Sequence, residues 1–426
     1  MQAFPSPPSK PRIHVTPERG PIDSALTIEL SGFPPQQELT LRATLDDPRG
    51  RAWCSHAVFL TDASGAVSVG SALPVSGSYA CADADGLLWS LAPAGDAPKA
   101  PFDESTLKPL SVTFSAELAG TAVASAVVER YFLADDCRML ALNEDGLVGT
   151  LFQPAGAGPF PTVLIIGGSA GGQVFSGQCA AVLAGHGYAS LALSYFAGEG
   201  LPEHLVGIRL EYFARAMSWL RAQPGAQGEG LAVIGRSRGG ELALLLGATY
   251  PEVRKVVAYC PSNVVWCGIQ NGNMVDASAW THREAALPYL APDLTPEEKA
   301  EIFRKRPIEL RPVFELPVDP LRKSAATIPV ERIAGSVLVF SGNDDRMWPA
   351  GSMCDAVIAR LAEHHHPHPF AHHRYPQAGH LLRAPCMPTS VLDSPTMALG
   401  GAAQGQALAN RQAWTELLRA LAGEVF

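Results

Sequence analysis

The stretch LAVIGRSRGGELAL covers residues 231–244 and predicts a short buried strand, a tight turn and then a helix. The turn has the form Gly-x-Ser-x-Gly, with Ser237 between Gly235 and Gly239. A serine raised out of a sheet on such a turn needs small residues on both sides, because strand and helix pass close together there. The pentapeptide alone could also be a glycine-rich turn with an incidental serine. Because a strand and a helix flank it here, we predict that Ser237 is a nucleophile on a strand-to-helix elbow.

The region around this elbow alternates between expected strands and expected helices. Residues 161–166 form a continuous apolar run of the kind that parallel sheets bury on both faces. The alternation predicts an α/β fold with a mostly parallel, doubly wound sheet. Further strands are expected at residues 147–152, 188–195, 255–260 and 336–340, and helices at residues 202–222, from the elbow to residue 250, and around Trp414, Leu417, Leu418 and Leu421.

Two other regions differ from this α/β region in their pattern of apolar and polar residues. Residues 26–133 alternate apolar and polar positions between turn clusters, which predicts an immunoglobulin-like β-sandwich without helices. Residues 77–91 are aromatic and irregular, so we expect a packed loop across the sandwich or an interface to the next domain. Residues 261–330 separate two expected core strands and contain a plausible helix at 295–304, which predicts a cap over the active-site edge. The expected domains are residues 1–135 and residues 136–426, the second with its cap.

A serine nucleophile needs a base, and the base needs an acid that fixes its tautomer. In an α/β hydrolase these groups follow the order Ser, acid, His along the chain. The strand at 336–340 leads into Gly-Asn-Asp-Asp, and the usual Gly-x-x-Asp geometry favours Asp345 over Asp344 as the acid. His380, in Ala-Gly-His after the last expected strand, is the predicted base. The crowded histidines match no zinc spacing and are expected in a solvated loop; they are His364, His365, His366, His368, His372 and His373.

Charge that develops on a substrate carbonyl oxygen requires preset N–H donors. One predicted donor is the backbone of Arg238, the residue after the nucleophile. The second is expected from the glycine-rich loop at 167–172, where the choice between Gly168 and Ser169 stays open. That loop lacks the Lys-Ser/Thr ending of a phosphate-binding loop, so a nucleotide is not expected.

Composition excludes several classes of function. The net charge of −9 argues against a general nucleic-acid binder, and no apolar run reaches the length of a membrane span. Residues 1–17 are rich in Pro and Ser and do not resemble an export signal, so we expect a cytoplasmic protein. The eight cysteines form no C-x-x-C pair, which predicts reduced thiols. No metal and no cofactor are expected, and the sequence does not indicate an oligomeric state.

Taken together, these pieces resemble the acyl-CoA thioesterase and bile acid-CoA:amino acid N-acyltransferase family over nearly the whole chain. The resemblance implies a sandwich followed by an α/β hydrolase, and acyl transfer from a coenzyme A thioester by Ser237, His380 and Asp345. The similar stretches are residues 77–79 and 86–90, residues 239–242 after the nucleophile, residues 328–332, residues 342–348 around the acid, and Ala413 with Trp414.

The type of nucleophile selects among the reactions of that family. Members that transfer the acyl group to an amino acid tend to carry a cysteine, whereas a serine accompanies hydrolysis, so Ser237 favours an acyl-CoA thioesterase. An acyltransferase to an amine or alcohol, an esterase or peptidase, and more remotely a non-catalytic binding protein are the alternatives. Arg236 and Arg238 depart from the family pattern, as does the long cap. Arg236, Arg238 and Arg346 could bind phosphates or a substrate carboxylate, or could be surface charges or pair with nearby acids.

Overall fold

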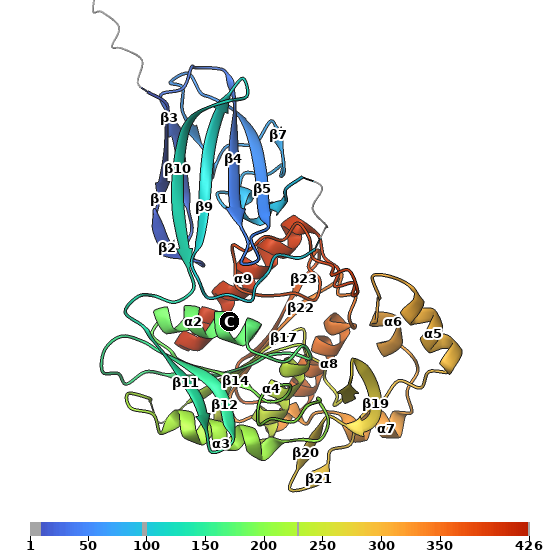
Figure 1. Cartoon of the computed structure of the whole chain (residues 1–426). Helices are drawn as coiled ribbons and strands as arrows, with labels where there is room; N and C mark the ends of the chain where they lie inside the picture. Colours follow the sequence, from blue (N-terminus) through green and yellow to red (C-terminus); the bar gives the residue numbers. More distant parts are fainter. Residues whose placement is uncertain (1–9, 96–99, 228–229, 425–426) are drawn as a thin grey trace, which may run out of the picture. The chain divides into compact units, whose positions relative to one another are not determined.

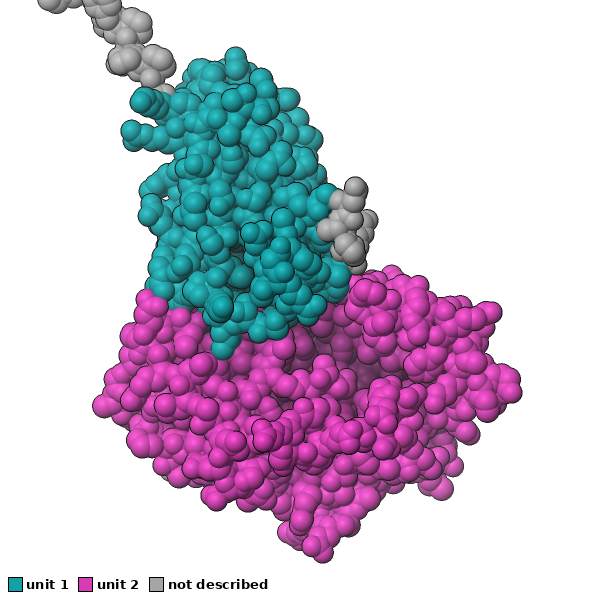
Figure 2. Space-filling view, in the orientation of Figure 1, with its two compact units in different colours: residues 1–132, 385–391 teal, residues 133–384, 392–426 magenta. Residues whose placement is uncertain are grey.

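The computed structural model describes residues 10–95, 100–227 and 230–424. The Pro-rich start of the chain is therefore only partly covered, since residues 1–9 lie outside the described ranges. The chain divides into two compact units, which Figure 2 colours separately. Unit 1 holds residues 1–132 together with residues 385–391, and unit 2 holds residues 133–384 and 392–426.

Unit 1 is built from two sheets, one of order β1-β3-β6 and one of order β2-β10-β9-β4-β5-β7 with β8 beside β5 (Figure 1). Apart from the parallel pair of β10 and β2, the paired strands are antiparallel. Alternate residues of β4, such as Leu39 and Leu41, are buried, as the period-two pattern predicted. The strands are β1 (Arg12–Thr16), β2 (Arg19–Pro21), β3 (Thr27–Ser31), β4 (Glu38–Asp46), β5 (Ala52–Leu60), β6 (Val67–Ser68), β7 (Ser76–Gly77), β8 (Ala92–Pro93), β9 (Leu110–Leu118) and β10 (Thr121–Tyr131).

One expectation for this unit needs correction. The expected loop at 77–91 contains a short helix, α1 (Gly86–Trp89), whose residues are all buried. The indole of Trp89 donates to Asp83 over 3.1 Å, and the Trp89 carbonyl accepts a 2.8 Å bond from the backbone N–H of Thr389. The chain thus returns to unit 1 at residues 385–391, which the sequence pattern did not indicate.

Unit 2 contains an eight-stranded sheet of order β11-β12-β14-β13-β16-β17-β22-β23, the strand order of an α/β hydrolase (Figure 1). β12 is antiparallel to both of its neighbours, and the later neighbouring pairs are parallel. All five residues of β13 are buried, as expected for a central parallel strand. The strands are β11 (Arg138–Glu144), β12 (Leu147–Gln153), β13 (Thr162–Ile166), β14 (Ala189–Ser194), β16 (Leu231–Arg236), β17 (Val253–Tyr259), β22 (Ser336–Gly342) and β23 (Phe370–Tyr375).

Helices cover this sheet on both sides, as in a doubly wound fold; Figure 1 shows α2 and α3 on opposite sides of its first strands. The helix expected at 202–222 begins only at Leu210. Gly207 has a φ of +61°, and β15 (Ile208–Arg209) pairs with β20, so neither segment is helical. None of the described helices combines the length and apolar character that crossing a membrane requires. The helices around the sheet are α2 (Val174–Gly185), α3 (Leu210–Arg221), α4 (Arg238–Thr249), α8 (Ala350–Glu363) and α9 (Ala403–Ala422).

The segment between β17 and β22, drawn in yellow and orange in Figure 1, has its own small elements. The expected helix is α5, and it begins after Thr295, whose side chain forms a capping box with Glu298. α7 begins after Asp319, whose carboxylate accepts two backbone N–H groups. The elements are β18 (Cys267–Gln270), β19 (Asn273–Ser278), β20 (Trp280–His282), β21 (Ala285–Ala286), α5 (Pro296–Arg304), α6 (Arg311–Phe314), α7 (Pro320–Ala326) and the 3-10 helix η1 (Val330–Arg332).

The histidine-rich stretch is not a wholly solvated loop. His372 and His373 lie on β23, which pairs in parallel with β22. His366 is buried, and its Nε2 lies 2.9 Å from the carbonyl oxygen of Gly335. The expected loop is therefore limited to the turn between α8 and β23, because sheet pairing orders the residues that follow.

Candidate active site

Ser237 lies between β16 and α4 with a φ of +59° and a ψ of −123°, the strained backbone of an elbow. Its backbone N–H donates to Tyr259 on the adjacent strand over 2.8 Å. A Cβ at Gly235 would overlap the backbone of Gly239, and one at Gly239 would overlap the backbone of Gly167. Both glycines are therefore required by close packing, as the Gly-x-Ser-x-Gly pattern predicted.

Asp345 lies in the turn after β22 and is fully buried. Its Oδ1 accepts backbone N–H groups from Met347 at 2.9 Å and Trp348 at 3.2 Å, which leaves Oδ2 free to face another group. Asp344 points elsewhere, since it accepts the N–H of Gly401 over 2.8 Å. Of the two candidate acids, Asp345 is therefore the one that is fully buried and oriented by the backbone of its own turn.

His380 lies on the loop after β23 and joins the other two residues. Its Nδ1 is 2.8 Å from Asp345 Oδ2, and its Nε2 is 2.9 Å from Ser237 Oγ. The His380 backbone N–H donates to Leu399 over 2.9 Å, and the ring packs edge-on against Trp348. Residues separated by 143 positions thus form one continuous Ser–His–Asp chain of hydrogen bonds.

This chain of hydrogen bonds opens onto a cavity of about 270 Å³. Ser237 and His380 lie on its wall, and most of the other lining side chains are apolar or aromatic. The additional lining residues are Ser169, Arg238, Trp266, Cys267, Ile269, Gly272, Met274, Phe303, Leu310, Phe314, Met347, Trp348 and Met397.

The predicted oxyanion donors lie next to Ser237. Arg238 is the first residue of α4, where backbone N–H groups have no partner within the helix. A Cβ on Gly168 would lie 3.2 Å from Ser237 Cβ, so this glycine passes directly beside the nucleophile. Ser169 lines the cavity, and the Tyr195 hydroxyl steadies the loop by donating to Gly167 over 2.9 Å. The geometry keeps both Gly168 and Ser169 as candidates for the second donor.

With the site described, comparisons with known proteins identify the family. A family model described as "BAAT / Acyl-CoA thioester hydrolase C terminal" matches residues 208–423, and one described as "Acyl-CoA thioester hydrolase/BAAT N-terminal region" matches residues 23–144. The chain belongs to the acyl-CoA thioester hydrolase/BAAT family.

Individual relatives of this family member span nearly its whole length. Acyl-coenzyme A thioesterase 2, mitochondrial, of Mus musculus is 29% identical over 421 positions, covering 95% of this chain and 87% of the relative. Acyl-coenzyme A thioesterase 1 of Mus musculus is 28% identical over 410 positions, covering 93% of this chain and 92% of the relative. Among solved structures, a dienelactone hydrolase-like promiscuous phosphotriesterase from metagenomic libraries has a TM-score of 0.40 at 17% identity, covering 67% of this chain and 97% of that chain.

In this member of the acyl-CoA thioester hydrolase/BAAT family, the Arg238 side chain is part of a buried network. Its guanidinium pairs with Glu241 over 2.8 Å and donates to the carbonyl oxygens of Trp266 at 2.9 Å and Cys267 at 3.1 Å. Glu241 also accepts the indole N–H of Trp280 over 2.7 Å. Burial raises the pKa of Glu241 to about 7, although Arg238 opposes the shift. Arg238 therefore connects α4 to the start of β18, and Glu241 connects α4 to β20.

Unlike Arg238, the other two arginines do not line the cavity. Arg236 lies with its guanidinium 4.3 Å from the centre of the Phe175 ring, and burial lowers its pKa to about 10. Arg346 pairs with Asp344 over 3.2 Å on the surface. The substrate-binding role predicted for Arg236 and Arg346 thus has no support from the lining, because stacking and ion pairing engage both side chains elsewhere.

Two residues near the nucleophile were not singled out from the sequence. Glu241 could have been noticed from its i, i+3 spacing to Arg238 on the expected helix. Cys260, directly after β17, is fully buried. Burial, with a contribution from Asp345, raises the pKa of this thiol well above its ordinary value, so it is protonated at neutral pH. Ser237 Oγ, 2.9 Å from His380 Nε2, is therefore the candidate nucleophile.

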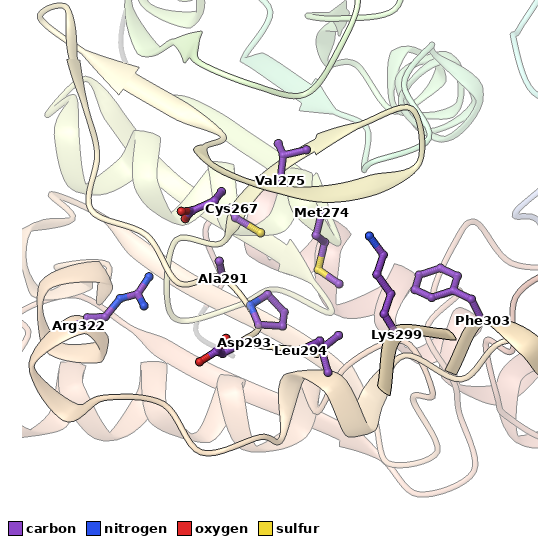
Figure 3. A pocket seen from close by; sticks show the side chains of 11 residues that line it. Cys267, Met274, Val275, Ala291, Asp293, Leu294, Lys299, Phe303 and Arg322 are labelled. Atoms are coloured by element: carbon purple, nitrogen blue, oxygen red, sulfur yellow. The ribbon is translucent and has the colours of Figure 1, made fainter. Parts of the chain in front are cut away.

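A second hollow, of about 400 Å³, adjoins the first and shares Cys267, Met274 and Phe303 with it (Figure 3). Lys299 and Phe303 of α5 point toward it, and its wall also carries Arg322 and acidic side chains. Neither Ser237 nor His380 lines this hollow. The larger hollow is therefore lined by the segment between β17 and β22, and the smaller cavity is the one that Ser237 and His380 line.

Proposed function

We propose that this chain hydrolyses acyl-coenzyme A thioesters through Ser237, His380 and Asp345. The observation that carries the proposal is the unbroken hydrogen-bond chain from Asp345 through His380 to Ser237 at the wall of an apolar cavity. Membership of the acyl-CoA thioester hydrolase/BAAT family, and relatives named acyl-coenzyme A thioesterases, support the same chemistry.

In the first half of the reaction, His380 Nε2 accepts the proton of the Ser237 hydroxyl as Oγ bonds to the thioester carbonyl carbon. Asp345 holds the ring in the tautomer that carries hydrogen on Nδ1 and stabilises the imidazolium that forms. The carbon–sulfur bond then breaks, and the departing thiolate takes its proton from His380. The acyl group remains on Ser237 as an ester.

In the second half, water replaces the thiol. His380 removes a proton from the water, the oxygen bonds to the acyl carbon, and Ser237 leaves with the proton returned by His380. In both halves the backbone N–H of Arg238, with that of Gly168 or Ser169, stabilises the negative carbonyl oxygen. No step requires a cofactor.

The cavity lining indicates an apolar acyl group. Trp266, Ile269, Phe314 and Met397 contribute aromatic, aliphatic and thioether surfaces that favour methylene groups over charged ones. The Arg238 guanidinium is already engaged by Glu241 and by the carbonyl oxygens of Trp266 and Cys267. Chain length and branching are the properties that such a wall would select.

The experiment is thiol release from short, medium, long and branched acyl-CoA substrates by the wild type and by Ser237→Ala, together with fluorophosphonate labelling. Release by the wild type and its loss in Ser237→Ala are expected. Labelling of Ser237 without release from any acyl-CoA would replace the proposal by an esterase or peptidase. Absence of labelling would favour a non-catalytic binding protein.

Transfer of the acyl group to an amine or alcohol is the alternative reaction, because the resemblance seen in the sequence also covers amino acid N-acyltransferases. Product analysis with and without glycine or taurine separates the two, since hydrolysis yields only free acid. The cytoplasmic location also stays a prediction, because one relative in mouse is named mitochondrial.

A further inference from the structure

Cys260 is held by hydrogen bonds to β22, the strand before Asp345, and to Trp348 in the turn after it. Its backbone N–H donates to Phe340 on β22 over 2.7 Å, and its carbonyl oxygen accepts the indole N–H of Trp348 over 3.1 Å. Its Sγ lies 4.0 Å from the carbonyl oxygen of Gly379, the residue before His380. The thiol is therefore held at the junction of the acid turn and the base loop, and the proposed reaction does not use it.

Three different metal-binding side chains meet at this junction. One donor atom each from Cys260, Asp345 and His380 lies within 4.8 Å of the other two, and all three residues are buried. Within the described parts of the chain, no other group of three or more such side chains gathers as closely. A thiolate sulfur, an imidazole nitrogen and a carboxylate oxygen form the mixed donor set that zinc accepts in tetrahedral sites with one open position.

We propose that Cys260, His380 and Asp345 form an inhibitory site for a thiophilic divalent cation such as Zn²⁺. His380 Nδ1 and Asp345 Oδ2 already lie 2.8 Å apart, so a further separation of about 0.5 Å lets both ligate one cation, which replaces the proton that they share. On binding, the Cys260 thiol releases its proton to solvent as sulfur bonds to the metal. The proton on His380 Nδ1 moves to Nε2 as Nδ1 becomes a ligand.

Inhibition follows from this change of tautomer. With hydrogen on Nε2, His380 donates to Ser237 Oγ and cannot accept its proton, although the two atoms stay within 2.9 Å. The cavity wall at Ser237 stays open, so the ion acts on the base without filling the acyl cavity. The inhibitory consequence rests on the proposed role of His380, whereas binding of the ion does not.

The test uses the full chain and two readouts that do not depend on acyl-CoA. Binding is measured with Co²⁺, whose thiolate charge-transfer absorption reports a cobalt–sulfur bond. Inhibition is measured as the rate of fluorophosphonate labelling of Ser237 with and without Zn²⁺, and a chelator should restore the rate. In the wild type we expect one equivalent of Co²⁺ to give the absorption, and Zn²⁺ to slow labelling by about tenfold or more.

Substitution separates this site from the other thiols. Cys260→Ala should lose the absorption and the effect of Zn²⁺, measured against its own rate without metal. Cys260→Ser is the second variant if alanine impairs folding, since a hydroxyl is a poor ligand for soft ions. Cys354→Ala, which removes another fully buried thiol on α8, should behave like the wild type. Equal inhibition of Cys260→Ala and the wild type, or an absorption that persists in Cys260→Ala, would overturn the proposal.

Discussion

Unit 2 contains a second Ser–His–Asp chain of hydrogen bonds beside the proposed catalytic one. Ser341 Oγ lies 2.7 Å from His372 Nε2, and His372 Nδ1 lies 2.9 Å from Asp355 Oδ1. Each distance is within 0.2 Å of its counterpart between Ser237, His380 and Asp345, which measure 2.9 and 2.8 Å. The two chains also follow the same order of atoms, from hydroxyl through Nε2 and Nδ1 to carboxylate.

The two chains differ in backbone and access. Ser237 lies on a strained elbow at the wall of a cavity, whereas Ser341 lies within β22 and has no exposed surface. The solvent exposure of the acids runs the other way. Asp345 is fully buried, whereas Asp355 is half exposed and also pairs with Arg374. A hydrogen-bonded triad is therefore not itself a catalytic site. A catalytic site also needs a serine that a substrate can reach.

The largest expected difference comes from removing each serine. Ser237→Ala should lower thiol release by about 10⁴- to 10⁶-fold, since the covalent route disappears. Ser341→Ala should stay within about threefold of the wild type, because Ser341 touches no reacting atom. Initial rates and mapping of the fluorophosphonate-labelled peptide check this, and a label on Ser341 would break the comparison.

The second largest difference is expected when each of the two acids is replaced. Asp345→Asn keeps the shape of the side chain but favours the wrong His380 tautomer, so kcat should fall by about 10⁴-fold. Asp355→Asn should change kcat by less than about tenfold, because it acts only on His372 and Arg374. Single-turnover rates measure both variants, and similar losses would mean that the second chain takes part in catalysis.

The third expected effect is on stability, and it comes from Glu241, the buried carboxylate on the helix after Ser237. The folded pKa of Glu241, about 7, lies above its unfolded value, so the folded state binds more protons between these values. Wild-type stability should therefore fall relative to Glu241→Gln as pH rises through this window, by up to about 3 kcal/mol. Urea unfolding of both proteins at pH 5 and pH 8 measures the difference. A gap that does not change with pH would contradict the assignment.

The smallest effect should come from His372. Its pKa is lowered rather than raised, so stability should change with pH in the direction opposite to that expected for Glu241. Burial lowers the pKa of His372, although Asp355 opposes this and Arg374 and His373 add to it. The unfolded state therefore binds the proton first, so wild-type stability should fall relative to His372→Gln as pH drops below about 6.5. The same unfolding series, extended to lower pH, tests the sign. A gap that widens on raising the pH would show that His372 is charged in the folded protein.

The sequence predicted those features that short patterns encode. The α/β-hydrolase fold and the family were predicted correctly. The glycines of the elbow were also expected, because a side chain at either position would clash with nearby backbone. The spacing of Asp345 and His380 after their strands also led to residues that meet Ser237, although their catalytic roles stay predictions. Each of these inferences depends on a few neighbouring residues.

Features that depend on distant partners were missed or misjudged. His372 looked like part of a solvated cluster because its partners, Ser341 and Asp355, come from other elements. The start of α3 was misplaced because pairing of β15 with β20 replaces the first expected turns. Local periodicity contains no information about such pairings.

Residues 385–391 belong to unit 1 although they follow His380 in the chain. During synthesis the β-sandwich is translated first, yet its final segment emerges only after Ser237, Asp345 and His380 of unit 2 have been made. Neither unit is a continuous length of chain that a single cut could release. The sandwich and the hydrolase must therefore be completed together, and a gene fragment that ends before residue 385 encodes neither of them whole.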